Sequence, residues 1–181
     1  EKLREDANSM PIDEQRRHAI ALSTQIKEEQ VPVVRRELVR TLSHLHVVES
    51  ETGLTTAMED NDPDIRIVAC KAWGARPSQT AKKSLLKAVR SDEDTDVQSA
   101  ALRALGNFQG QDVFEELKRA LESRQPAVQY AGIQGLRNLT GEDWGEDPET
   151  WLAGLEGKSP EVVHDGRESF IDALHPRNLI R

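Results

Sequence analysis

The sequence is poor in the residues that build a compact or disulfide-linked core. Only 4% of its 181 residues are aromatic, and 36% are hydrophobic. Cys70 is the only cysteine, which excludes an intrachain disulfide and a cysteine-rich metal site and leaves a cytoplasmic and an exported protein equally compatible. A repeat array needs fewer large apolar side chains than a globule, because each unit buries only a thin slab against its neighbours. The composition therefore favours repeats.

Long apolar runs are also missing, and the charge is unevenly spread. No stretch approaches about 18 consecutive apolar residues, so no membrane-spanning helix is expected. The net charge is −8; residues 1–90 carry 15 Lys/Arg and 14 Asp/Glu, whereas residues 91–181 carry 9 and 18. Because an acidic half repels a phosphate backbone, we expect no general nucleic-acid binding.

An internal repeat is present. Four segments align without gaps at starts 31 or 32 residues apart: VPVVRRELVRTL from Val31, DPDIRIVACKAW from Asp62, DTDVQSAALRAL from Asp94 and QPAVQYAGIQGL from Gln125. In each segment, the apolar or small residues at positions i, i+4, i+5 and i+8 form one stripe along an α-helix. Proline near the start suits a first helical turn, and Asp62 suits an N-cap. We name these segments A helices. The first stripe position is Val34, Ile65, Val97 and Val128, and the last is Leu42, Trp73, Leu105 and Leu136.

A second helix, the B helix, follows each A helix. Its markers are Leu22, Leu54, Leu85 and Leu117, again 31 or 32 residues apart. The turns between helices are expected at Gly53, Gly74, Pro77, Gly106 and Gly110, which break helices. Glu116, next to the marker Leu117, is expected on the exposed side of its helix. Each unit is thus an A helix, a turn and a B helix, and no strand pattern competes.

The pattern D-P-x-[VI]-[RQ]-x-x-A-x-x-A-L, from Asp62 to Trp73 and from Asp94 to Leu105, resembles the HEAT repeat in its short bacterial form, found also in bilin-lyase-like (PBS-lyase-type) proteins. The resemblance covers residues 14–174 and implies an all-α solenoid, a superhelix of about four to five helix-turn-helix repeats. It is specific for fold and unspecific for function, because this repeat serves scaffolds, lyases and other enzymes.

The repeat also sets the expected boundaries. Residues 1–13 are an N-terminal segment or degenerate helix, residues 14–174 form the array with units starting near 31, 62, 94, 125 and 159, and residues 175–181 are a C-terminal tail. The acidic segment 140–151 interrupts the fourth unit. Its spacing differs from a calcium-binding loop, so we expect Asp147 to cap a helix, and Trp144 and Trp151 to cover the end of the core.

Catalytic patterns are not found. None of the five histidines is followed by Glu, unlike the His-Glu pairs of the HEAT-like deoxyhypusine hydroxylases, and Cys70 falls in a core column. No Gly-rich phosphate loop or nucleophile elbow occurs. We therefore expect no catalytic residue, no cofactor and no metal.

The basic cluster Lys82, Lys83, Lys87 and Arg90 lies on the B helix of the second unit. The leading hypothesis is a non-enzymatic scaffold, monomeric in isolation, that holds a protein partner on the concave face of the B helices. Two alternatives stay open: an accessory or lyase-like enzyme on a HEAT scaffold, and a nucleic-acid-binding HEAT protein. The predicted partner-binding residues are Lys83, Lys87, Arg90, Arg119 and Glu122.

Overall fold

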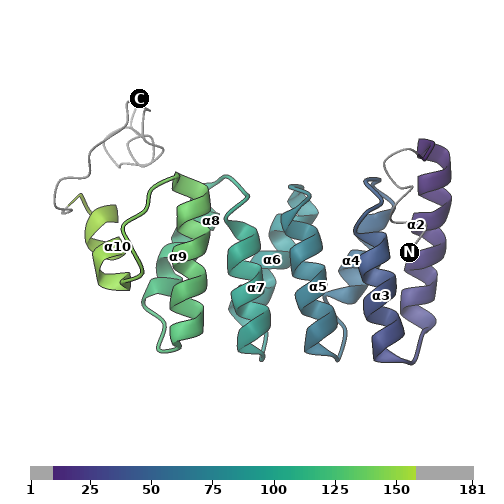
Figure 1. The fold of residues 1–181 in the computed structure, drawn as a ribbon, viewed down its shortest axis with the longest axis horizontal. Helices are drawn as coiled ribbons and strands as arrows, with labels where there is room; N and C mark the ends of the chain where they lie inside the picture. Colours follow the sequence, from purple (N-terminus) through teal and green to yellow (C-terminus); the bar gives the residue numbers. More distant parts are fainter. Residues whose placement is uncertain (1–9, 158–181) are drawn as a thin grey trace.

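The computed structural model describes residues 10–157, which form two layers of helices along one axis (Figure 1). The A helices are α3 (Pro32–Leu42), α5 (Pro63–Gly74), α7 (Thr95–Leu105) and α9 (Pro126–Thr140). The B helices are α2 (Ile12–Glu28), α4 (Ser50–Ala57), α6 (Gln79–Ser91), α8 (Gln111–Leu121) and α10 (Pro148–Leu155). Within the described range there is no strand, and the α-solenoid predicted from the repeat period is confirmed.

The A helices begin at equivalent positions because equivalent capping chemistry recurs. The side chain of Asp62 accepts a hydrogen bond from the backbone N–H of Asp64, and that of Asp94 accepts one from Asp96. Each bond satisfies a donor that the first helical turn leaves without a partner. Proline takes the first position of α3, α5 and α9, where its missing N–H costs nothing.

The core between the layers is built from the repeated columns, with one exception at the N-terminal end. Ile65, Val97 and Leu105 are fully buried, but Val34 is 37% exposed. Within the described residues, α3 has an A-layer neighbour, α5, on one side only. Large exposed hydrophobic side chains gather at the same end of the array: Ile12, Ile20, Val31, Val33, Val34 and Val48.

Gly53 does not form the predicted turn. It lies inside α4, where an added Cβ would stand 2.5 Å from Leu42 Cδ2 and 2.5 Å from Ser23 Oγ. The expectation of a helix break at this glycine is therefore wrong. The missing side chain lets α4 approach α2 and α3 closely instead, so Gly53 is a packing residue.

Buried ion pairs join successive units in the first half of the array. Arg35 donates from Nε and Nη2 to the carboxylate of Asp60, at 2.7 and 2.9 Å. Arg66 repeats this arrangement on Asp92, at 2.9 and 2.8 Å, and also donates to the backbone oxygen of Asp60. Arg35 also donates to the backbone oxygens of Glu29 and Gln30, at the end of α2. Because the bonds of the two arginines link the ends of α2, α4 and α6, they fix how each unit sits on the next. We call these two ion pairs the arginine clamps.

The C-terminal end of the described array is closed by the two tryptophans. Trp151 is fully buried, its ring centroid lies 4.9 Å from that of Trp144, and its Nε1 donates to the backbone oxygen of Gly145. Asp147 accepts a hydrogen bond from the backbone N–H of Thr150 at the start of α10, which confirms its predicted capping role.

The outer boundaries are tested only in part. The helix α2 begins at Ile12, two residues before the predicted start of the array. The expected fifth unit near residue 159 and the expected tail lie outside the described residues. No helix between residues 10 and 157 is long and apolar enough to cross a membrane.

Candidate functional site

The two layers differ in how tightly their helices pack, and this difference creates a groove. Along the A layer, α5 contacts α7 and α7 contacts α9 extensively. In the B layer α2 packs firmly on α4, but α4 touches α6, and α6 touches α8, only slightly. The helix α4 has 8 residues and α6 has 13, so the shorter helix leaves part of the longer one uncovered. A groove of about 620 Å³ opens between them.

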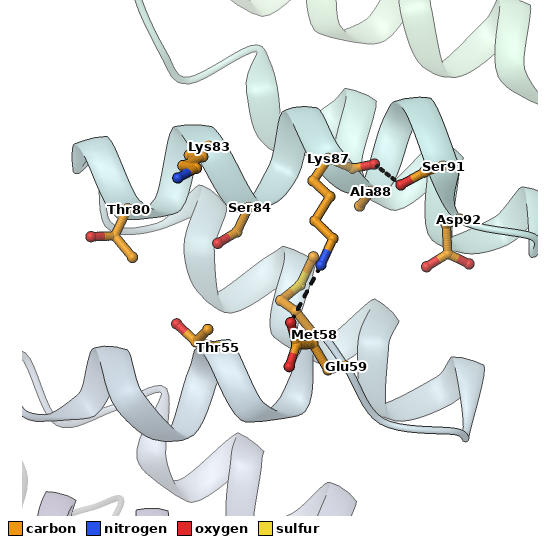
Figure 2. A pocket seen from close by; sticks show the side chains of 10 residues that line it. All are labelled: Thr55, Met58, Glu59, Thr80, Lys83, Ser84, Lys87, Ala88, Ser91 and Asp92. Carbon is orange, nitrogen blue, oxygen red and sulfur yellow. Dashed lines mark hydrogen bonds and ion pairs between the residues drawn. The ribbon is translucent and has the colours of Figure 1, made fainter.

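One stripe of α6 and the end of α4 line this groove (Figure 2). The spacing of the α6 residues, three or four apart, is that of one helical face. The adjoining side of the helix carries the buried Ala81 and Leu85, which anchor it in the core. The lining residues from α6 are Thr80, Lys83, Ser84, Lys87, Ala88 and Ser91. Those from α4 and its C-cap are Thr55, Met58 and Glu59.

The floor of the groove is apolar. Met58 is partly buried and Ala88 is 6% exposed. Beneath them, Cys70 is fully buried and its thiol donates to the sulfur of Met58 at 3.7 Å. Burial, reinforced by the charge of Asp92, raises the pKa of Cys70 to about 12. Cys70 is thus a packing residue, as its column predicts, because a reactive thiol needs a lowered pKa and access to solvent.

The rim of the groove is cationic on the α6 side. Lys87 crosses over Met58 toward α4, and its Nζ lies 3.3 Å from Glu59 Oε1 (Figure 2). Both side chains of this pair are about two-thirds exposed, so the pair contributes little to stability. Lys83 is exposed and forms no ion pair with any residue in the described range. Both lysines are therefore available to a bound partner.

Arg90 and Arg119 lie in the next contact along the B layer, where they meet at Glu116. Arg90 Nε lies 2.6 Å from Glu116 Oε2, and Arg119 Nη1 lies 3.0 Å from Oε1. Glu116 itself is only 3% exposed, so the prediction that it faces solvent is wrong. It faces α6 because it shares the buried side of α8 with Val113 and Leu117, and the two arginines supply the positive charge that a buried carboxylate needs.

The structure thus divides the five predicted partner-binding residues. Lys83 and Lys87 line the groove, Arg90 and Arg119 hold Glu116, and Glu122 is exposed at the C-cap of α8, outside the groove lining. Sequence reasoning missed the hydroxyl groups of Thr80 and Ser84. Their one-turn spacing on the face that carries the lysines was the signal that could have found them.

Other polar clusters have structural roles. Arg76 donates to the backbone oxygens of Leu42 and Ser43 and so caps the C-terminus of α3, while burial lowers its pKa. Within residues 10–157, no three His, Cys, Asp or Glu side chains are grouped so that they could hold a metal ion. The groove combines cations, hydroxyl groups and an apolar floor, which is the chemistry of a binding surface.

Comparison with known proteins identifies the family. A family model described as HEAT repeats matches residues 20–97 and 83–150, which together span most of the chain. A search of curated proteins found no match. The matched residues run from within α2 into α10 and so include all four A helices and both walls of the groove. The chain belongs to the HEAT-repeat family.

Proposed function

We propose that this protein is a non-enzymatic interaction module that holds a protein partner on the B-helix face, at the groove between α4 and α6. One observation carries the proposal. At the groove two neighbouring B helices stand apart and expose an apolar floor beside Lys83, which forms no ion pair within the described residues, and Lys87, whose ion pair is exposed to solvent. Arrays of this family commonly act as interaction scaffolds, and their stacked helices offer extended binding surfaces.

The walls of the groove suit a protein more than a polyanion. Glu59 and Asp92 flank the two lysines of the groove, and the whole chain has a net charge of −8. A long phosphate backbone would therefore meet more negative than positive charge along the array, whereas a short segment can contact the lysines alone. The walls are also fixed: Ser78 caps α6 by accepting a hydrogen bond from the N–H of Ala81. A preformed surface loses little conformational entropy on binding, which favours affinity.

A non-enzymatic role agrees with the chemistry of the lining. Activated hydroxyl nucleophiles are hydrogen-bonded to a general base. Within the described residues, Ser84 and Thr80 make no such bond, and the neighbouring lysines point elsewhere, Lys87 toward Glu59 (Figure 2). The hydroxyl groups are therefore free to hydrogen-bond to a ligand.

Site-directed photo-crosslinking tests this proposal. A photoreactive residue replaces Lys83 in the groove or, as the matched control, Lys71, an exposed lysine of α5 on the A layer. In extract from the native source we expect a protease-sensitive adduct from position 83 and none from position 71. Adducts from position 71 alone would place the partner on the A layer, and nuclease-sensitive adducts would make the partner a nucleic acid.

A further inference from the structure

We infer that the groove between α4 and α6 takes an extended peptide segment in which acidic and apolar residues alternate. The acidic side chains face Lys83 and Lys87, and the apolar side chain between them faces Met58. This inference rests on the proposed function, because it names the chemistry of the partner at the same site.

The spacing of the two lysines matches an extended chain. Lys83 and Lys87 are four residues apart on α6, and four residues of an α-helix rise about 6 Å. In an extended segment, residues i and i+2 point to the same side and lie about 6.6 Å apart. A carboxylate at i therefore reaches Lys83 while a carboxylate at i+2 reaches Lys87. The side chain at i+1 points the other way, toward Met58 at the C-cap of α4.

The hydroxyl groups of the α6 wall distinguish an extended segment from a helix. An extended segment carries backbone N–H and C=O groups that need partners when they are buried, whereas a helix satisfies its own. Thr80 and Ser84 lie one turn apart on the groove face, and neither side-chain hydroxyl group makes a hydrogen bond within the described residues. They can donate to, or accept from, the backbone of a segment lying along α6.

The floor supplies the apolar half of the recognition. Met58 lies between the two walls and has a flexible, polarizable side chain that adapts to different apolar partners (Figure 2). Ala88 and the methyl group of Thr55 border the same space. An apolar residue at the middle position of the segment thus removes exposed apolar surface on both sides.

The existing contact between Lys87 and Glu59 makes a distinctive prediction. A carboxylate of the partner that reaches Lys87 must share or take over its ammonium group, and the nearby charge of Glu59 repels it. Glu59 therefore competes with the partner. Substitution of Glu59 by glutamine, which removes the competing charge and keeps the shape, should strengthen binding by a few-fold, whereas a merely structural role of this pair gives no such gain.

The experiment uses a fluorescent five-residue peptide that alternates glutamate and leucine, titrated with the whole chain by fluorescence polarisation. The wild-type protein should bind it, and Lys83→Glu with Lys87→Glu should weaken binding by at least about tenfold. The matched control, Lys71→Glu with Arg103→Glu on the A layer, makes the same charge change and should bind like wild type within about twofold. Ser84→Phe, which fills the groove without a charge change, should also abolish binding. Circular dichroism checks that each variant is folded.

Several results would overturn the inference. Absence of binding to the wild-type protein contradicts it, as does an equal loss in the A-layer control. If a peptide of the same composition with all its glutamates at one end binds as tightly as the alternating peptide, the alternation of acidic and apolar residues is refuted. Tighter binding of a stapled helical peptide with acids four residues apart refutes the extended form, and tighter binding of single-stranded oligonucleotide refutes the partner class. If the crosslink from position 83 persists while the peptide fails, this inference falls and the proposed function stands; loss of both overturns both.

Discussion

The first two units of the array and the two that follow are joined at the same position by different chemistry. In the first half, Arg66 binds the carboxylate of Asp92 and the backbone oxygen of Asp60. In the second half the equivalent residue is Gln98, which keeps only the backbone bond, to the oxygen of Asp92 at 2.7 Å. The carboxylate partner is also missing there, because Ser123 stands near the place of the aspartate. The hydrogen bond to the backbone is thus common to both halves, and the ion pair forms only where the arginine and the aspartate are both present.

The B layer shows a second contrast between neighbouring contacts. Gly53 brings α4 tightly onto α2, and the ion pair of Arg90 with Glu116 bridges α6 and α8. Between them, the exposed pair of Lys87 and Glu59 is the only ion pair that joins α4 and α6 within the described residues. Hollows also lie between α2 and α4 and between α6 and α8, so grooves between B helices recur along the array. The groove between α4 and α6 is the one lined by Met58 and Ala88.

The largest effect is expected at the second arginine clamp. Arg66→Gln removes the partner of a nearly buried carboxylate and should lower the free energy of unfolding by about 3–5 kcal/mol. Adding Asp92→Ser to this variant recreates the chemistry of the third unit and should restore most of the loss. Gln98→Ala, the control in the second half, should cost about 1 kcal/mol. Urea melts measure all three, and no recovery in the double variant would mean that the two halves are not interchangeable.

A smaller effect is expected where α2 meets α4. Gly53→Ala places a methyl group against Leu42 and Ser23 and should destabilise the fold by about 1–3 kcal/mol through overpacking. Ser84→Thr also adds a methyl group, but into the open groove, and should change stability by less than about 0.5 kcal/mol. Thermal melts of the two variants compare a tight contact with an open one. Similar losses would show that the groove is closed in solution.

The bridge between α6 and α8 should contribute an intermediate amount. Glu116→Ala removes a buried acceptor but leaves two half-exposed arginines that water can solvate, so we expect a loss of about 1–2 kcal/mol. Glu59→Ala at the groove should cost less than about 0.5 kcal/mol, since both members of its pair are exposed. Chemical denaturation distinguishes the two, and equal costs would contradict the contrast drawn within the B layer.

The smallest effect is a difference in pH dependence between the two halves. Burial alone raises the pKa of Asp60, but hydrogen bonds from Arg35 and from the backbone of Asp62 outweigh it and lower the pKa below 3.8. The native state then binds this proton more weakly than the unfolded state. The resulting stability is present above pH 3.8 and is lost as the pH falls through the folded-state value.

The variant Asp60→Asn tests this dependence. Its deficit in unfolding free energy should be full at about pH 6 and should shrink as the pH falls through the lowered folded-state pKa of Asp60. Gln98→Ala has no titrating group and should show a deficit that is constant with pH. A constant deficit for Asp60→Asn would mean that the clamp acts through its shape alone.

Periodicity predicted the fold, because cap residues and apolar stripes act locally and recur at a fixed interval. It placed Leu105 and Cys70 in the core and Asp62 at a helix start, as observed. It could not predict Gly53 or Glu116, since each depends on the angle at which one helix meets another. From the sequence alone, a glycine predicts a turn and a glutamate predicts an exposed position, and only the neighbouring helix shows otherwise.

The candidate site was accessible to sequence reasoning only in part. The cations Lys83 and Lys87 were visible as a cluster on one helical face, and both line the groove. The groove itself was not visible, because it arises from the lengths of α4 and α6 and from how far apart they stand. Arg90 was grouped with the lysines by the same spacing, although a partner on another helix engages it.

The buried thiol of Cys70 provides a natural probe of local opening of the array. A thiol-specific reagent cannot reach this sulfur in the closed state, and a pKa of about 12 keeps almost none of it in the reactive thiolate form. The rate at which the thiol is modified therefore measures how often the second unit opens locally and exposes Cys70 to solvent. Since Cys70 is the only cysteine, an exposed cysteine introduced elsewhere can be labelled selectively, because the buried native thiol reacts far more slowly.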